Sequence, residues 1–221
     1  MIGVKPLFSG DQVSEGPTAG FEVIAIGPSG ARIDLAGANW ELLKVNRRFQ
    51  WYRNGSSWNY EPIVSTQRVA SGTLDLTTGA AARISAAVDW GTYRLEVIDP
   101  GSATTATSVT FSAGWVSLSA QADTPDVLEV GLDKADYTPG ETAKVRLDPR
   151  FAGTAVISVV TDRLLYSETV DVPAEGTSID LTVDESWGPG AYVTAMLFRP
   201  MDVAAGRMPS RAIGLDWLSL D

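Results

Sequence analysis

The chain has 221 residues, with 27 Asp and Glu against 17 Lys and Arg, so its formal net charge is −10. So acidic a surface repels phosphate backbones and anionic headgroups, which argues against binding to nucleic acid. Cysteine and histidine are both absent. Their absence excludes thiol nucleophiles, Cys/His zinc sites, Ser-His-Asp triads and disulfides. We therefore expect a protein that is not an enzyme and that uses no cofactor and no metal.

Alternation of apolar and polar residues with a period of two dominates the chain, and turns rich in glycine and proline separate the alternating segments. No segment of 12 or more residues carries an apolar stripe at helical spacing. The clearest strand-like segments are 21–26, 93–97, 127–130, 143–147 and 178–183. Short strands without helices predict an all-β fold of two tandem antiparallel sandwiches, immunoglobulin-like or fibronectin type III-like.

The two halves of the chain repeat three features in the same order. Each has a glycine-containing turn that enters a strand, at 16–23 and at 139–145, and each later has a Trp-Gly pair before a strand with a tyrosine. Each ends in a near-copy, Trp-Val-Ser-Leu at 115–118 and Trp-Leu-Ser-Leu at 217–220. The repeat indicates two copies of one sandwich, residues 1–121 and 122–221, joined through the small polar residues 120–126.

The Trp-Gly pairs have a structural interpretation, which we prefer to a ligand-binding one. In each copy a glycine permits a sharp entry into a late strand, while Trp and Tyr close the end of the sandwich. The tyrosine hydroxyl is expected to bond back to the backbone, as in tyrosine corners. The residues concerned are Trp90, Gly91 and Tyr93 in the first half and Trp187, Gly188 and Tyr192 in the second.

Residues 48–61 are predicted to form an aromatic hairpin inserted into the first sandwich. Asn54-Gly55 between aromatic segments favours a type I′ turn, in which both residues have positive φ. That register pairs Trp51 with Trp58 and Phe49 with Tyr60 on one face. The extra length of the first half is attributed largely to this hairpin.

Two functions fit the face formed by Phe49, Trp51, Trp58 and Tyr60. Aromatic rings on a flat β-face are a platform on which sugars stack. Alternatively, the rings cap the sandwich or pack on a neighbouring domain. We favour packing, because the polar residues that usually accompany a sugar platform point to the other face in this register.

Carboxylate pairs at Asp123/Asp126, Asp133/Asp136 and Asp184/Glu185 could in principle support glycoside hydrolysis without histidine. All three pairs lie beside turns, where Asp is favoured by hydrogen bonds to its own backbone. We interpret them as solvated turn residues. No stretch approaches the roughly 20 apolar residues that a membrane span needs.

The second half contains the phrase Tyr137-Thr138-Pro139-Gly140-Glu141 between two strands, in which Pro139 presets φ and Gly140 supplies the positive φ of a type II turn. This phrase resembles the opening of macroglobulin domains in the alpha-2-macroglobulin family. Later segments are similar to the bacterial branch of that family, and the first half looks like the preceding domain. The later segments are 149–155, 161–163, 187–193 and 211–215, and those of the first half are 3–8, 70–74 and 90–97.

The resemblance implies two adjacent mid-chain macroglobulin domains, near the fifth and sixth, close to the bait region of a bacterial protease-trapping inhibitor. Such proteins collapse around a protease that cleaves the bait, often with a reactive Cys-Gln thioester, which a chain without cysteine lacks. The implied role is a scaffold, with neighbouring macroglobulin domains as partners and proteases reached only through the full-length protein. The implied location is the periplasm or cell envelope, and the start of the chain suggests a piece of a longer protein. The alternative is a carbohydrate- or protein-binding β-sandwich module of a bacterial surface protein.

Overall fold

The structure, a computed structural model, describes residues 1–13, 18–102, 105–115, 124–205 and 207–221, and for Trp58 it describes the backbone alone. Strands make up nearly all of the regular structure. Within the described ranges the one helical element is a single 3₁₀ turn, η2 (Glu185–Trp187). The prediction of an all-β fold is therefore confirmed. No helix among the described residues is long and apolar enough to cross a membrane.

The chain divides into two compact units. The first comprises Met1–Arg47 and Val64–Gly114, and the second comprises Trp115–Asp221 together with Arg48–Ile63. The segment 48–63 is the outer part of the aromatic hairpin. Its contacts group it with the second unit. The boundary expected between residues 121 and 122 lies outside the described residues.

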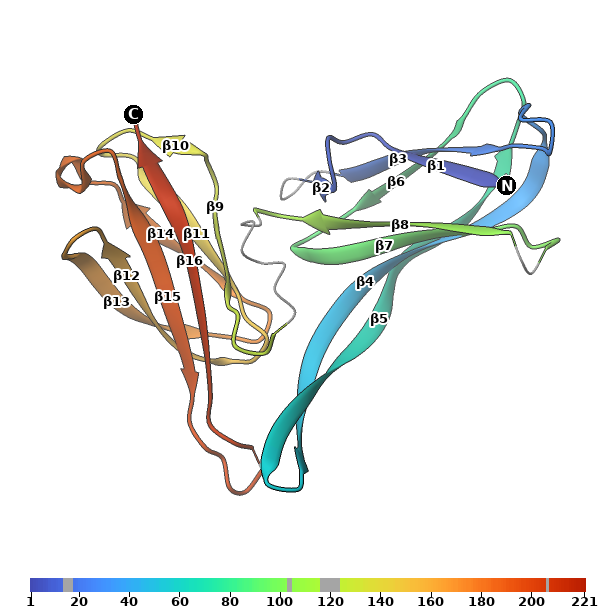
Figure 1. Cartoon of the computed structure of the whole chain (residues 1–221). Coiled ribbons are helices and arrows are strands. Elements are labelled where there is room, and N and C mark those ends of the chain that lie inside the picture. The colour runs from blue at the N-terminus through green and yellow to red at the C-terminus, as the bar shows by residue number, and fades with distance from the viewer. Residues whose placement is uncertain (14–17, 103–104, 116–123, 206) are drawn as a thin grey trace. The chain divides into compact units, whose positions relative to one another are not determined.

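The first unit is built from two sheets (Figure 1). The smaller has the strand order β1-β3-β6, which are Ile2–Pro6, Thr18–Ala25 and Ala82–Ala87. The larger has the order β2-β8-β7-β4-β5, which are Gln12–Val13, Ala106–Ala113, Gly91–Ile98, Leu35–Asn54 and Ser57–Leu76. Its pairs are antiparallel except for the short parallel contact of β2 with β8.

The second unit repeats this arrangement strand for strand. Its smaller sheet contains β9 (Glu129–Leu132), β11 (Thr142–Asp148) and β14 (Thr177–Thr182), with β11 in the middle. Its larger sheet has the order β10-β16-β15-β12-β13, which are Asp136–Tyr137, Ser210–Leu220, Gly190–Arg199, Gly153–Val160 and Leu164–Val172. The short parallel pair also recurs, here between β10 and β16. Each strand of the second unit thus corresponds to the strand eight positions earlier, which confirms two tandem copies of one sandwich.

Strand alternation forms a hydrophobic core in each unit. In the first unit, the rings of Phe8, Phe21, Tyr93 and Phe111 meet with centroids 5.3–5.6 Å apart. In the second, the aliphatic side chains of β11, β12 and β15 meet between the sheets, among them Leu147, Ile157 and Leu197, none of which is exposed. Apart from the hydroxyls of buried tyrosines, the side chains buried in the described part of the chain are apolar or aromatic, so each core is held together mainly by apolar contact.

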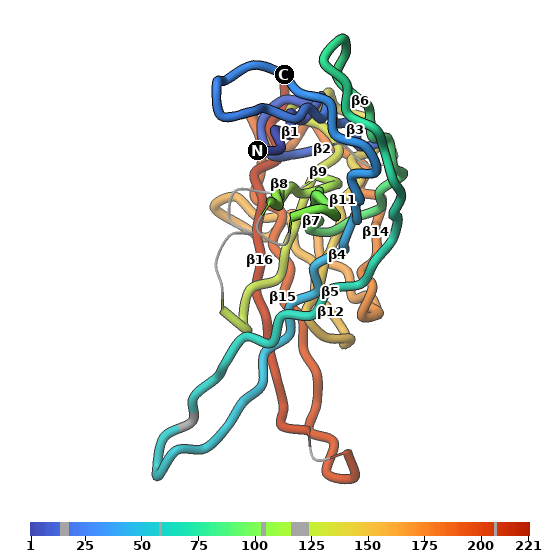
Figure 2. Tube along the Cα trace, turned by 90° about the vertical axis from the view of Figure 1, so that its right-hand side faces the viewer, coloured from blue at the N-terminus to red at the C-terminus, as the bar shows by residue number. Residues whose placement is uncertain are grey.

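Strands β4 and β5 form the long hairpin of the first unit. Each is 20 residues long, whereas the corresponding strands β12 and β13 have 8 and 9. Figure 2 shows β4 and β5 running together to the tip of this hairpin. The insertion predicted in the first half is therefore an extension of a hairpin that both copies share.

The turn of this hairpin differs from the predicted type I′ turn at Asn54 and Gly55. Strand β4 ends at Asn54 and β5 begins at Ser57, so the turn residues are Gly55 and Ser56. Gly55 has φ 63°, and no other residue type among those described has positive φ. Glycine at the first central position is the requirement of a type II′ turn. Counted back from this turn, Trp51 lies opposite Tyr60 rather than Trp58, and the Trp51 and Tyr60 ring centroids are 5.4 Å apart. The predicted register was therefore wrong by two residues, while the shared face of Phe49, Trp51 and Tyr60 is kept.

Candidate functional site

A tight turn between β10 and β11 carries the phrase that the sequence analysis singled out. The Glu141 N–H donates to the Thr138 carbonyl oxygen at 3.1 Å, which closes a four-residue turn. Pro139 and Gly140 are its two central residues, and Gly140 has φ 89°. These are the residue types and the positive φ that a type II turn requires.

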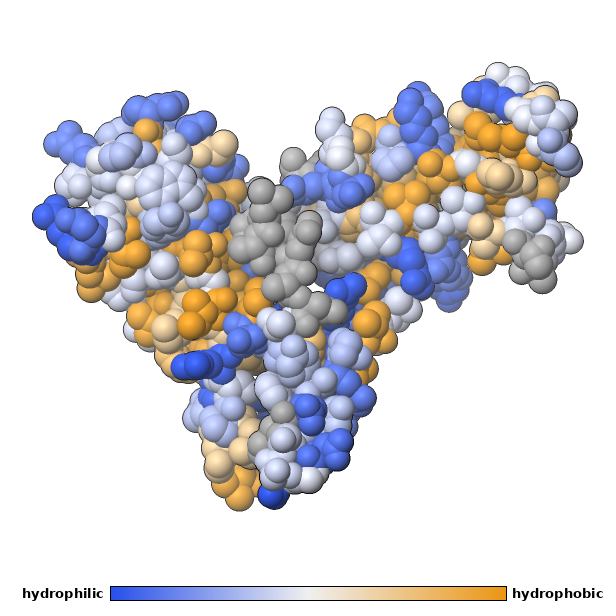
Figure 3. Space-filling model, in the orientation of Figure 1, coloured by the Kyte–Doolittle hydropathy of each residue, from blue (hydrophilic) through white to orange (hydrophobic). Residues whose placement is uncertain are grey.

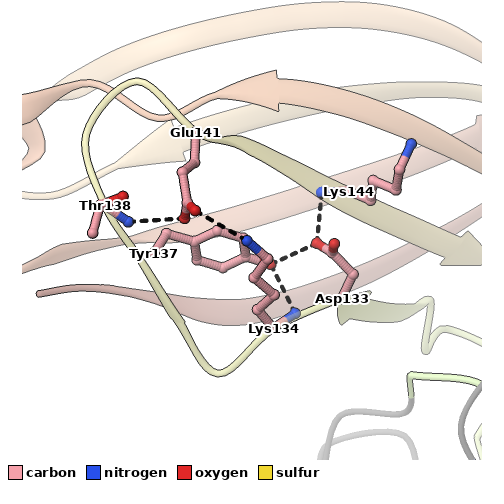
Figure 4. A network of polar contacts seen from close by, with 6 residues as sticks. All are labelled: Asp133, Lys134, Tyr137, Thr138, Glu141 and Lys144. Carbon is pink, nitrogen blue, oxygen red and sulfur yellow. Dashed lines mark hydrogen bonds and ion pairs between the residues drawn. The ribbon is translucent and has the colours of Figure 1, made fainter.

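The Tyr137 side chain, only 1% exposed, anchors this turn to the core (Figure 4). Its hydroxyl accepts a hydrogen bond from the Lys134 N–H at 3.0 Å and donates one to Asp133 Oδ1 at 2.8 Å. The same carboxylate oxygen accepts from the Lys144 N–H, at the start of β11, at 2.8 Å. One tyrosine and one aspartate thus tie the end of β9, strand β10 and the start of β11 together.

Glu141 closes the other side of the turn. Its carboxylate accepts from the Thr138 N–H at 3.1 Å and from Lys134 Nζ at 3.2 Å. The hydrogen bond from Thr138 and the interaction with Lys134 lower the pKa of Glu141. In contrast, burial and the hydrogen bond to Asp133 raise the pKa of Tyr137 well above its usual range. Both shifts favour the protonation states that this network needs at neutral pH.

In the first unit, Tyr93 forms a comparable contact by a different route. The Tyr93 side chain is 2% exposed, and its hydroxyl accepts a hydrogen bond from the Asp89 N–H at 3.1 Å. Burial raises the pKa of Tyr93. The neighbouring Trp90 is 8% exposed, and Gly91 begins strand β7 with φ 137°. The geometry is that of a tyrosine whose hydroxyl bonds back to the backbone four residues upstream.

Tyr192 differs from the expectation for the second unit. Trp187 is buried and Gly188 follows it with φ 66°, but Tyr192 is 47% exposed. Ala191 and Val193 on either side of it face the core, so the alternation of β15 turns Tyr192 outward. The corner expected at Tyr192 is therefore absent, and Tyr137 makes the buried hydroxyl contacts of this unit. The Tyr192 ring instead meets the Trp217 ring edge to face, with centroids 4.8 Å apart.

The aromatic face of the hairpin is only partly covered. Phe49 is half-buried, whereas Trp51 and Tyr60 are 47% and 39% exposed. The Phe49 and Tyr60 ring centroids lie 5.7 Å apart. Within the second unit, the Arg150 guanidinium lies 4.9 Å from the Phe49 ring centroid, at the distance of a cation–π contact. The side chain of Trp58, which the sequence analysis placed on this face, lies outside the described residues.

Two of the carboxylates beside turns, Asp133 and Asp184, accept hydrogen bonds from backbone N–H groups. Asp184 accepts from the Ser186 N–H at 2.8 Å and so caps η2, and its hydrogen bonds with Ser186 lower its pKa. Asp133 belongs to the Tyr137 network, and Asp123 lies outside the described residues. Among the residues that the structure describes, no group of three or more acidic side chains could hold a metal ion. This arrangement can brace turns, but it presents no paired acid and base.

Sequence reasoning found Tyr137, Pro139 and Gly140 but missed the partners of Tyr137. Asp133 was interpreted as a solvated turn residue, and Lys134 was not singled out. The available signal was spacing, because an Asp four residues before a buried Tyr lies within reach of its hydroxyl at the end of a short β-arch. Trp217 was noted only as part of the repeat, although it is the cross-strand partner of Tyr192.

Family models match both halves of the chain. Residues 3–115 match the model described as bacterial macroglobulin domain 6, and residues 128–221 match the alpha-2-macroglobulin bait region domain. Together with the paired all-β sandwiches, these matches define a part of a macroglobulin. The chain belongs to the bacterial alpha-2-macroglobulin family, as its sequence motifs indicated. The expected position near the fifth and sixth domains is corrected by these matches, because the first half corresponds to domain 6 and the second to the bait region domain.

Relatives and solved structures agree with this assignment. Alpha-2-macroglobulin of Xylella fastidiosa strain 9a5c is 30% identical over 97% of this chain, and that of Escherichia coli K12 is 30% identical over 94%. The chain spans 13% of the length of each. Among solved structures, the native conformation of E. coli alpha-2-macroglobulin is similar with a TM-score of 0.58 at 27% identity. Salmonella alpha-2-macroglobulin reacted with methylamine has a TM-score of 0.54 at 28% identity, and this chain covers 15% of each solved chain.

Proposed function

We propose that this chain is a non-catalytic structural part of a bacterial alpha-2-macroglobulin that inhibits proteases by trapping them. In this role the two sandwiches maintain the spacing and orientation of neighbouring macroglobulin domains in the parent chain. Proteases are partners of the full-length protein and not of this segment alone. By family, the parent acts in the periplasm or cell envelope.

One observation carries this proposal. The buried side chains of the described residues are all hydrophobic, and the polar network around Tyr137 ends on backbone groups and turn carboxylates. Hydrogen bonds of this kind hold a shape and do not transfer protons to a substrate. The chain has no cysteine that could form a thioester.

The aromatic hairpin fits the same role as a packing element. Phe49 is half-buried and has Arg150 over its ring, which supports the packing of this face over its use as a sugar platform. The packing face consists of Phe49, Trp51 and Tyr60. Loss of either Phe49 or Arg150 should therefore lower stability, and loss of both should cost less than the sum of the two.

The experiment compares two variants of the full-length parent. Leu147→Ala opens a cavity in the second core, since Leu147 is fully buried, whereas Thr142→Ala changes an exposed position on the same strand. If the segment is a scaffold, Leu147→Ala reduces the amount of protease trapped, and Thr142→Ala traps as much as the unmodified parent. Undiminished trapping by Leu147→Ala, with a verified loss of local stability, would contradict the scaffold role.

A further inference from the structure

A cavity of about 460 Å³ opens at one end of the second unit, on the outer face of its larger sheet. Three segments line it: the β12–β13 turn at Thr161–Arg163, the loop from Ser186 to Gly190, and the cross-strand pair Tyr192 and Trp217. All of these residues belong to one compact unit. The volume lies within the range of small-ligand sites, which is roughly 300–1,000 Å³.

Two aromatic rings form the apolar wall of this cavity. Tyr192 and Trp217 face each other across β15 and β16, their planes are 69° apart, and the side chains are 47% and 43% exposed. Nearly half of each side chain is therefore accessible from the cavity or from the surrounding surface. Figure 3 shows apolar residues on the surface of this unit. The exposed hydrophobic residues of β15 and β16 also include Met196, Ile213 and Leu215.

The backbone beside Trp217 is shaped to hold the indole in place. Gly190 has φ 147°, and a Cβ atom there would lie 2.6 Å from Trp217 Cζ2 and would also collide with the Leu218 carbonyl oxygen. No other residue fits at this position without moving the indole. The Trp217 ring therefore lies close against Gly190, while Trp187 of the same loop packs into the hydrophobic core.

Polar groups of both signs form the rim of the cavity. The Thr161 hydroxyl donates to Asp162 Oδ1 at 3.0 Å, which orients that carboxylate, and the Thr161 N–H donates to the Arg163 carbonyl oxygen at 3.0 Å. Within the described ranges, no carboxylate lies within ion-pair distance of the Arg163 guanidinium. A carboxylate acceptor and a guanidinium donor thus lie next to an open indole face.

We propose that this cavity binds the pyranose ring of an oligosaccharide. A sugar ring has one face of C–H groups that stacks on an aromatic ring and a rim of hydroxyls that both donate and accept hydrogen bonds. The Trp217 face matches the first, and Asp162 with Arg163 matches the second. A proline-rich peptide would need parallel aromatic ridges along a groove, whereas these two rings are nearly perpendicular.

The test titrates the 221-residue chain with chitotriose and with maltotriose, up to about 10 mM, and follows the indole N–H signals by NMR. The expected result is a saturable shift of the Trp217 indole and the Gly190 amide with one of these sugars. Trp217→Leu should weaken binding at least about tenfold, because leucine keeps the apolar bulk and loses the ring face. Trp51→Leu, in the hairpin, is the matched control and should leave the affinity unchanged.

Arg163→Gln keeps the proposal testable if Trp217→Leu does not fold, because Arg163 lies in an exposed turn. This variant should weaken binding while its thermal unfolding stays unchanged. The absence of any shift at Trp217, or shifts that Trp51→Leu abolishes, would overturn the proposal. A proline-rich peptide that shifts Trp217 where the sugars do not would also overturn it. Calorimetry on the full-length parent completes the test, since a neighbouring domain seated on Trp217 would abolish sugar binding there and refute the site.

Discussion

The buried Tyr137 hydroxyl donates a 2.8 Å hydrogen bond to Asp133 Oδ1, and the same oxygen accepts a 2.8 Å hydrogen bond from the Lys144 N–H of β11. The turn at Pro139 and Gly140 is therefore held by Tyr137 together with an aspartate that lies four residues before that tyrosine. The tyrosine fixes where the turn begins, and the aspartate fixes where the next strand starts.

Tyr137→Phe should lower the free energy of unfolding of the second unit by about 1–3 kcal/mol. The substitution leaves the Lys134 N–H without its acceptor and removes one of the two donors to Asp133 Oδ1, at a buried position where lost hydrogen bonds are costly. Urea denaturation measures the loss. The matched control is Tyr166→Phe, whose hydroxyl bonds Glu168 on the exposed surface, with an expected change within about 0.5 kcal/mol. Equal effects of the two variants would show that the Tyr137 network is not what stabilises the turn.

Alkaline pH should unfold the protein through its buried tyrosines. The folded pKa values of Tyr93 and Tyr137 lie above the ordinary value of 10.0. Between the unfolded and the folded pKa of each tyrosine, the folded chain keeps the proton that the unfolded chain releases. The contribution of these tyrosines to stability is therefore fully present below pH 10 and is lost as the pH rises above it. The measurement is the unfolding free energy from pH 8 to pH 11. Tyr137→Phe should flatten this dependence in the second unit, and an unchanged slope would contradict the assignment.

Asp216 is predicted to oppose folding at neutral pH. Burial raises its pKa above the ordinary 3.8, although the N–H groups of Trp217 and Leu132 donate to it. The contribution of Asp216 to the stability of the fold is therefore most favourable below pH 3.8 and is lost as the pH rises through the folded pKa. Asp216→Asn, which keeps an acceptor oxygen, should be at least as stable as the unmodified chain at pH 7, with no advantage at pH 3. The exposed control Asp180→Asn should change stability by less than about 0.5 kcal/mol at pH 7. A marked destabilisation by Asp216→Asn at pH 7 would refute this account.

The turn between β15 and β16 should be the first site that trypsin cuts. Met201 and Val203 are 55% and 81% exposed, and Asp202 and Arg207 form an isolated bridge outside the named strands. Exposed turns of this kind are preferred cleavage sites, whereas Arg48 and Arg53 lie within strand β4. Mass spectrometry of early digests should identify residues 1–207 as the first fragment. Arg207→Gln should remove this fragment, and an earlier cut after Arg53 would contradict the prediction.

Much of the fold follows from the sequence because strand alternation and turn chemistry are local properties. The period-two segments, the Trp-Gly repeats and the Tyr137–Glu141 phrase were enough to predict two sandwiches and their family. The prediction of the hairpin turn was wrong because Asn54 and Gly55 suit a type I′ turn as well as Gly55 and Ser56 suit a type II′ turn. No local feature of the sequence distinguishes the two turns. The prediction of a buried corner at Tyr192 was wrong because the face to which a strand residue points depends on the register of the strand. The cavity beside Trp217 could not be foreseen, since its three segments meet only in the folded chain.

We propose that this chain supports a structure and performs no chemistry of its own. To test this, a fixed amount of trypsin is incubated with increasing amounts of the isolated 221-residue chain, and trypsin activity is then assayed on a large protein substrate. We expect trypsin activity to stay constant while the chain itself is cut. A loss of activity in proportion to the chain added would contradict it.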